Sequence, residues 1–502
     1  MILGKRLDGL SFLLLPFCLL AGLLLLSCSP LSSQAPPAGS TALLPPNGSG
    51  QINDSQITLA VWTELMNDEA VSGHLINLQT ERGIVTLTGS VDNLLAKARA
   101  TEIAESIKGV RGVINRITVE TVVRPDREIS KDVKEALLLD PATDSYEIDV
   151  TTEDGVVTLT GWVQSWQEKQ LCNEVAKSVK GVRAVRDLIL VYLRGDRLDR
   201  EIQADIERRL KSDVWVDASF IDVNVTNGRV ILTGMVRSAW QKKHAYQAGW
   251  VAGVSSVDDG AITVDWLIGE QTTEQKAYGV IIPSNIELAR AVKDAFLYDP
   301  RVYADNIQVE ADAGTITLTG VVDNLKAKKA AEQDAENTVG VLQVKNHLRV
   351  RPKRLVPDDV IQENVLHALK RDAFLGRNNT ITASVNNARV HLYGTVHSNY
   401  EKNRAEDVTS RVKGVIAVKN GLGVYSVWTK KTDWEILQDI ANQLRWDPLV
   451  NDKAIEVTVT DGVATLTGAV DARNERDLAI KNAYEGGARH VNDRLTIKKC
   501  SF

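Results

Sequence analysis

Several common chemical signatures are missing from this 502-residue sequence. Its seven histidines and four cysteines fall in no metal-ligand spacing, and none of the HExxH, GxSxG, P-loop or GxGxxG patterns occurs. Positive charge is not in surplus either, because the formal net charge is −6, whereas a dedicated nucleic-acid binder normally carries a basic face or tail. We therefore expect no metal site, no cofactor, no nucleic-acid partner and no enzymatic activity.

The N-terminal residues 1–27 predict an export signal. Lys5 and Arg6 precede an apolar run that is short for a membrane-spanning helix. The run ends in Leu-Leu-Ser-Cys at Cys28, which resembles the bacterial lipobox, and this resemblance implies that Cys28 is lipidated. Residues 28–53 are rich in proline and small residues, which is typical of a flexible tether. By resemblance to the sorting rules of enteric bacteria, Ser29 after Cys28 implies the periplasmic side of the outer membrane; the alternatives are secretion to the periplasm or an inner-membrane anchor.

One sequence unit occurs six times. The phrase Thr-Leu-Thr-Gly, or a close variant, ends at Gly89, Gly161, Gly234, Gly320, Gly394 and Gly468. The step from the third to the fourth copy is longer than the others, which predicts a linker at 267–283 and two protease-resistant halves. The units, numbered here as modules 1 to 6, are 54–123, 124–193, 194–266, 284–352, 353–425 and 426–499.

The pattern inside a module predicts five elements. An amphipathic helix stops at an Asp-Pro pair such as Asp140-Pro141, and two alternating strands follow, joined by a tight turn such as Asp154-Gly155. A second helix and a closing strand complete the unit. We expect N-caps for the second helices at Asp92, Ser165, Ser238, Asp323, Ser398 and Asp471. The predicted fold is α+β, with six tandem αββαβ modules, each a three-stranded sheet covered on one face by two helices.

This combination resembles the BON domain, the bacterial osmotic-induction and nodulation module. The element order, the Asp-Pro helix stop, the hairpin that ends in Thr-Leu-Thr-Gly and the closing Gly-Val-x-x-Val-x-Asn/Asp carry the resemblance, which covers about 54–499. It implies a periplasmic or outer-membrane location, association with phospholipid and a role in envelope integrity under osmotic stress. No catalytic activity comes with it.

A basic residue stands eight positions after each glycine, at Lys97, Lys169, Lys242, Lys328, Lys402 and Arg476. The structural interpretation, which we favour, is that each base pairs with a recurrent carboxylate, namely Asp68, Asp140, Asp213, Asp299, Asp372 or Asp447. The functional interpretation is that each base meets a lipid phosphate near the start of a helix. Trp166, Trp240 and Tyr400 lie close by; they either contact the membrane interface or pack against a neighbouring module.

Cys172 occupies a position that is alanine in the other five modules, so we expect a buried small residue rather than a reactive thiol. We do not expect a disulfide between Cys172 and Cys500. The six glycines are expected to be structural. The resemblance implies a periplasmic protein that associates with anionic phospholipid, and six modules would do so many times over, since weak contacts gain from repetition. The alternative is a scaffold that joins envelope proteins.

Overall fold

The computed structural model describes residues 52–143, 147–192, 197–268, 283–375, 380–425 and 431–498. The predicted signal, Cys28, nearly all of the tether, most of the linker at 267–283, and Cys500 lie outside these ranges. Among the described residues, no helix is both long and apolar enough to cross a membrane.

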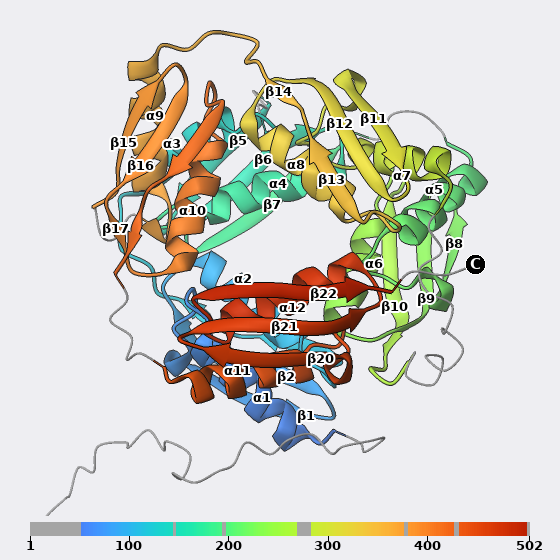
Figure 1. Ribbon diagram of the computed structural model, residues 1–502. Coiled ribbons are helices and arrows are strands. Elements are labelled where there is room, and N and C mark those ends of the chain that lie inside the picture. The colour runs from blue at the N-terminus through green and yellow to red at the C-terminus, as the bar shows by residue number, and fades with distance from the viewer. Residues whose placement is uncertain are drawn as a thin grey trace, which may run out of the picture. The chain divides into compact units, whose positions relative to one another are not determined.

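Each module has the predicted order of helix, strand, strand, helix and strand, which confirms the fold class (Figure 1). The first helices are α1 (Asp54–Asn67), α3 (Asp126–Leu139), α5 (Asp199–Ser212), α7 (Asn285–Leu297), α9 (Asp358–Arg371) and α11 (Asp433–Trp446). The second helices are α2 (Leu94–Glu105), α4 (Trp166–Lys177), α6 (Ala239–Ala248), α8 (Leu325–Glu336), α10 (Asn399–Ser410) and α12 (Arg473–Glu485).

Three strands form the sheet of each module. The first strands are β1 (Ile76–Glu81), β5 (Ile148–Glu153), β8 (Ile221–Thr226), β11 (Ile307–Asp312), β15 (Thr382–Asn386) and β20 (Ile455–Thr460). The central strands are β2 (Ile84–Val91), β6 (Val156–Val163), β9 (Arg229–Val236), β12 (Thr315–Val322), β16 (Arg389–Tyr393) with β17 (Thr395–Val396), and β21 (Val463–Val470). The closing strands are β3 (Gly112–Asn115) with β4 (Thr118–Val119), β7 (Ala184–Val191), β10 (Ser256–Val264), β13 (Gln343–Asn346) with β14 (Arg349–Val350), β18 (Ala417–Asn420) with β19 (Gly423–Val424), and β22 (His490–Ile497).

The sheet is mixed. The first and central strands form an antiparallel hairpin, and the closing strand pairs parallel to the central one, as in β5-β6-β7. Both helices cover one face, against which alternate central-strand residues such as Val157 and Leu159 are completely buried. The opposite face of each sheet carries no helix of its own module.

Aspartate at the start of the first helix supports the hairpin turn. In module 2 the Asp126 carboxylate accepts hydrogen bonds from the backbone N–H groups of Asp154 and Gly155, each 2.9 Å long. The same bonds recur at the turns of modules 1, 3, 5 and 6. In module 5 the turn residue Ala388 has φ +59°, so alanine there adopts a conformation that favours glycine. The turn keeps its geometry at the cost of local strain.

Three of the six expected N-caps are wrong. Ser165, Ser238 and Ser398 do cap α4, α6 and α10, but the N-cap residues of α2, α8 and α12 are Asn93, Asn324 and Ala472, of which Ala472 makes no side-chain capping bond. Every cap lies four residues after the repeated glycine, and the predicted aspartates lie three after it. The asparagine side chains accept a hydrogen bond from the N3 backbone of the helix, as a capping aspartate would. The N-cap position is therefore set by its distance from the repeated glycine and not by which residue type occupies it.

The helix layers of the modules pack in pairs: module 1 with 6, 2 with 5, and 3 with 4. In each pair the loop after a second helix donates a backbone hydrogen bond to the last turn of a first helix. These bonds run from Lys108 N to Trp446 O (2.9 Å), from Lys180 N to Arg371 O (2.7 Å) and from Val339 N to Ser212 O (2.8 Å). Every pair therefore joins one module from each side of the linker.

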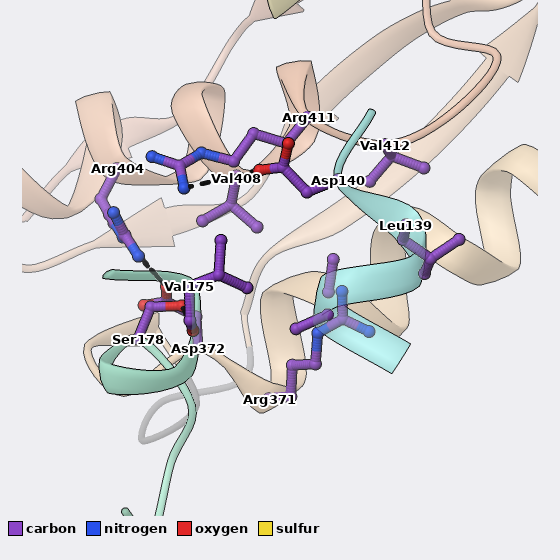
Figure 2. Close-up of a pocket in the computed structure, with 12 residues that line it drawn as sticks. Leu139, Asp140, Val175, Ser178, Arg371, Asp372, Arg404, Val408, Arg411 and Val412 are labelled. Atoms are coloured by element: carbon purple, nitrogen blue, oxygen red, sulfur yellow. Dashed lines mark hydrogen bonds and ion pairs between the residues drawn. The ribbon is translucent and has the colours of Figure 1, made fainter. Parts of the chain in front are cut away.

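Helices of both partners meet around a small cavity of about 40 Å³ between modules 2 and 5 (Figure 2). Arg404 binds Asp372 at 2.8 Å there, and Arg411 reaches Asp140 of module 2 at 3.9 Å. Because the helix layers face each other, the two sheets lie on the outside of the pair. Their helix-free faces consequently point away from one another.

Candidate functional site

The recurrent bases on the second helices form hydrogen bonds or ion pairs inside their own modules. The Nζ atoms of Lys97 and Lys169 each donate to a carbonyl oxygen of the closing strand segment at 2.7 Å, and those of Lys242 and Lys328 do so at 2.9 Å. The acceptors are Ile117, Ile189, Ile262 and Leu348. These four lysines tie the second helix to the last strand, which leaves their ammonium groups poorly placed for a lipid phosphate.

The other two bases depart from this pattern. Arg476 binds Asp493 on the closing strand at 2.6 Å, and Lys402 makes no comparable carbonyl bond among the described residues. The predicted partners are wrong, because the recurrent aspartates have other contacts. Asp68 binds Arg99 at 2.9 Å, and Asp372 binds Arg404. The predicted pairing of lysine with aspartate failed because the acceptors are backbone carbonyl oxygens, which residue types do not reveal.

Trp166, Trp240 and Tyr400 pack against other aromatic side chains. Trp166 of module 2 stacks on Trp250 of module 3, with ring centroids 5.4 Å apart and planes within 4°. Trp240 lies edge-on to Trp215 at 5.3 Å. Tyr400 lies edge-on to Phe374, and its backbone N–H donates to the Glu69 carboxylate of module 1. These rings therefore support the packing interpretation more than the membrane one.

The repeated glycines stand where no side chain fits. A Cβ atom on Gly161 would lie 2.0 Å from the carbonyl oxygen of Glu147, and the other five positions are equally crowded, at 1.8–2.2 Å. All six also have φ between +109° and +132°, a region that side chains rarely adopt. The close approach brings the central strand against the start of the first strand, which is a structural use of the residue.

Cys172 is a free, fully buried cysteine on the helix face that packs against the sheet. Burial, followed by the nearby carboxylates Glu168, Asp140 and Asp187, raises the pKa of its thiol to about 12. A thiol in this state is a weak nucleophile. Its position agrees with the alanines of the other modules, which are buried as well.

The helix-free face of module 5 gathers basic and aromatic side chains. Arg389, His391 and Tyr393 point outward from β16, because Val390 and Leu392 between them are buried in the core. Lys419 of β18 stands opposite His391, and Tyr425 follows β19 with 67% of its surface exposed. Among the described residues, the outward positions of β15, β16 and β18 carry no acidic side chain. This face is suited to an anionic surface.

Outward positions on the other five sheets include acids, namely Glu81, Asp149, Glu153, Asp222, Asp258, Glu310, Asp312 and Glu456. Module 2 differs in another way, because its outer face is apolar at one corner. Trp162 pairs across the strands with Leu190, which is 71% exposed, and Leu188 lies beside them. Tyr192 completes the patch, with its ring centroid 6.2 Å from that of Trp162. Neither outer face was predicted from the sequence, because the predicted binding residues lie on or beside the second helices.

Comparison with protein families assigns the modules. The BON domain model matches residues 53–121, 125–191, 198–265, 286–352, 357–424 and 432–499. The chain belongs to the BON domain family. Each match coincides with one αββαβ module to within a residue or two, so the tandem BON architecture is confirmed.

Three curated relatives match the chain over lengths close to two BON modules. Osmotically-inducible protein Y of Escherichia coli (strain K12) is 29% identical over 143 residues, covering 27% of this chain and 71% of that protein. An uncharacterized protein in the gshII 5′ region of Anaplasma centrale is 30% identical over 155 residues, covering 30% and 100%. Outer membrane lipoprotein DolP of Haemophilus influenzae (strain ATCC 51907 / DSM 11121 / KW20 / Rd) is 29% identical over 142 residues, covering 27% and 72%.

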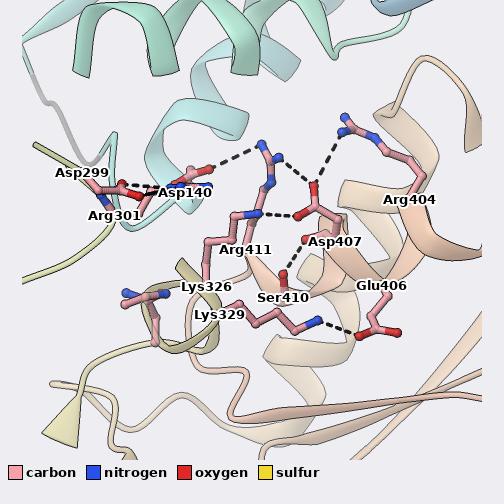
Figure 3. A network of polar contacts seen from close by, with 12 residues as sticks. Asp140, Asp299, Arg301, Lys326, Lys329, Arg404, Glu406, Asp407, Ser410 and Arg411 are labelled. Carbon is pink, nitrogen blue, oxygen red and sulfur yellow. Dashed lines mark hydrogen bonds and ion pairs between the residues drawn. The ribbon is translucent and has the colours of Figure 1, made fainter. Parts of the chain in front are cut away.

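A charged junction joins BON modules 2, 4 and 5 (Figure 3). Module 2 takes part through Asp140, which Arg411 of module 5 reaches at 3.9 Å. The Asp407 carboxylate of module 5 is bound by Lys326 of module 4 at 2.5 Å, by Arg404 of its own helix and by Arg411 directly after that helix. Burial alone would raise the pKa of Asp407, but Arg411, Lys326 and Arg404 outweigh it and hold that pKa well below its usual range. Lys329 of module 4 also pairs with Glu406 of module 5 at 2.6 Å. The BON modules are thus held together by specific ion pairs as well as by packing.

Proposed function

We propose that this chain is a non-enzymatic protein of the bacterial envelope that binds anionic phospholipid through the outer face of BON module 5. Membership of the BON family supports an envelope role, as do relatives named as an osmotically-inducible protein and an outer membrane lipoprotein. The observation that carries the proposal is the set of outward bases and tyrosines on one sheet without an acid among them.

The chemistry of that face matches a phospholipid headgroup layer. Arg389 and Lys419 supply cations for phosphate oxygens, and each base near an anionic surface contributes about 1 kcal/mol of binding. Tyr393, 49% exposed, and Tyr425 are amphipathic rings of the kind that settle at headgroup depth. No deep pocket is required, because the sheet offers a continuous outer surface.

Outward bases also occur on other modules. The closing strand segments of modules 4 and 6 expose Lys345, Arg349 and Arg494, whereas that of module 2 exposes Leu188 and Leu190 beside a single arginine, Arg186. Several weak contacts on one chain raise the effective affinity for a surface. A lipid chain on Cys28 would add a second attachment, and stable membrane binding generally needs two.

The test is co-sedimentation of residues 49–502, which form one compact unit, with vesicles. We expect binding to vesicles that contain phosphatidylglycerol, little binding to pure phosphatidylcholine, and a loss of binding as salt is raised. Equal binding to both vesicle types, or binding that salt does not weaken, would contradict the proposal.

A second function is favoured by the apolar corner of module 2. Trp162, Leu188, Leu190 and Tyr192 form an exposed patch of the residue types that anchor protein interfaces. Because this face points away from that of module 5, we propose that the chain also joins a protein partner to the membrane. Crosslinking through a photoreactive residue at position 188 should yield a discrete protein adduct; the absence of any adduct would contradict this second function.

A further inference from the structure

BON modules 4 and 5 are joined by a short loop, residues 351–357 between β14 and α9, which we call the 4–5 connector (Figure 1). The connector holds three bases and no acid, and a fourth base, Arg349 on β14, precedes it closely. The side chains of Arg351, Lys353 and Arg354 are all exposed. The connector is therefore a patch of positive charge on a chain whose formal net charge is −6.

The connector also exposes an apolar side chain. Leu355, which directly follows Arg354, is 97% exposed. Tyr303 of module 4 is 64% exposed, and the Nζ atom of Lys353 lies 5.7 Å from the centroid of its ring. Bases, a leucine and a tyrosine thus gather at one exposed place. Segments that bind a membrane interface have this composition, because the cations meet phosphate while the apolar groups enter the headgroup layer.

The positive charge of the connector is little used inside the protein. Lys353 pairs with Asp323 of module 4 at 3.3 Å, although the lysine side chain is still 81% exposed. Within the described part of the chain, Arg351 and Arg354 form no ion pair. The nearest acid along the sequence, Asp358, is bound to two backbone N–H groups of the hairpin turn of module 5. The guanidinium groups of the two arginines are therefore available to an anion from outside.

The connector of modules 1 and 2, residues 120–125, shows that the fold does not require a basic cluster here. It exposes Val123 completely at the position of Leu355, two residues before the proline that caps the next helix. It carries one acid and one base, and the base, Arg124, binds Asp132 of module 2 at 2.7 Å. Two modules can thus be joined without exposed bases, so the joining of modules does not explain those of the 4–5 connector.

We propose that the 4–5 connector is a second membrane contact, in which Leu355 enters the headgroup layer of an anionic bilayer while Arg351 and Arg354 bind lipid phosphates. The long arginine side chains can reach phosphate oxygens when the leucine lies deeper, because their apolar stems tolerate burial. The inference rests on the proposed binding of anionic membrane, and it adds a contact that the outer face of module 5 does not supply.

An environment-sensitive fluorophore on the connector tests the contact in residues 49–502. A nitrobenzoxadiazole label on Leu355→Cys, in a Cys500→Ser chain, should brighten with phosphatidylglycerol vesicles and stay unchanged with pure phosphatidylcholine. Cys172 is fully buried and should not take the label. The same label on Val123→Cys, at the matching position of the other connector, is the control and should not respond.

Co-sedimentation measures what the arginines contribute. Arg351→Gln with Arg354→Gln should weaken binding to phosphatidylglycerol vesicles about 30-fold. Arg127→Gln with Arg200→Gln is the control, because these two exposed arginines occupy the same position in α3 and α5. The control should change the affinity by less than about threefold. Thermal melting of each variant verifies that the fold persists.

Three results would overturn the proposal. They are unchanged affinity in the Arg351→Gln, Arg354→Gln chain, an equal response of the labels at 355 and 123, and a response of the label at 355 to soluble polyphosphate as large as that to vesicles. In each case, binding of the wild-type chain to phosphatidylglycerol vesicles would still support the proposed function. Absence of wild-type binding would overturn both, so the two failures are distinguishable.

Discussion

The outer sheets of BON modules 2 and 5 are alike in backbone and opposite in chemistry. Both are hairpins with a parallel closing strand, and both turn their helices inward against each other. Module 2 exposes Leu190 where module 5 has a short, glycine-rich closing segment, and module 5 exposes Lys419 and two tyrosines. Core positions preserve the fold, so the outward positions of each repeat are free to differ. Tandem repetition therefore allows one chain to present unlike surfaces in fixed directions.

The largest loss of stability is expected at the charged junction around Asp407, because this junction holds the modules that carry the two faces. Asp407→Asn removes the carboxylate that binds Lys326, Arg411 and Arg404, so that Lys326 loses its ion-pair partner while Arg404 and Arg411 keep only Asp372 and Asp140. Breaking such a buried group typically costs about 3–5 kcal/mol. The free energy of unfolding, measured in urea, should fall by that amount. Glu406→Gln on the same helix, which loses only the partly exposed pair with Lys329, is the control and should cost no more than about 1 kcal/mol.

The pH dependence of Asp407 sharpens this prediction. Its folded pKa is depressed, so its stabilisation is complete above the unfolded pKa of about 4 and is lost as the pH falls further. The Asp407→Asn chain should therefore lose less stability than wild type in that acidic range. Identical acid sensitivity in the two chains would contradict the role given to this carboxylate.

The pair of modules 1 and 6 should respond to pH in the opposite sense. Burial, followed by the nearby Glu485, raises the pKa of Glu64 to about 8, although the Gln443 side chain donates to its carboxylate. A raised carboxyl pKa means that stability decreases as the pH rises from about 4.5 to about 8. Glu64→Gln should abolish this decrease and stabilise the chain by a few kcal/mol at pH 8. Thermal melting across that range measures it, and an unchanged pH profile would contradict the assignment.

The smallest effect is expected from cutting the linker. Because modules 2 and 5 lie on opposite sides of 267–283 yet pack together, cleavage at an engineered protease site there should leave the two fragments associated. Size-exclusion chromatography should show one peak that contains both. Two separate peaks would mean that the halves are independent, as the sequence spacing alone suggests.

Much of the module could be predicted from the repeat. Buried alternation, the Asp-Pro stops and the glycine register specify the αββαβ order, because each depends on local backbone rules. The pairing of modules depends on contacts such as Lys180 with Arg371, which are far apart in sequence and have no local signature. The carboxylate partners predicted for the recurrent lysines were wrong for a related reason. Their partners are backbone carbonyls, which any residue provides.

The central claim is that the outer face of module 5 binds anionic phospholipid. Vesicle binding by variants with substitutions on this face tests the claim most directly. Arg389→Gln with Lys419→Gln removes two outward cations from module 5 without touching a core residue. At about 1 kcal/mol for each base, affinity for phosphatidylglycerol vesicles should fall about 30-fold. Arg116→Gln with Arg229→Gln, a matched pair of exposed bases on modules 1 and 3, should change affinity by less than about threefold. Equal affinity for the wild type and the module 5 variant would contradict the account.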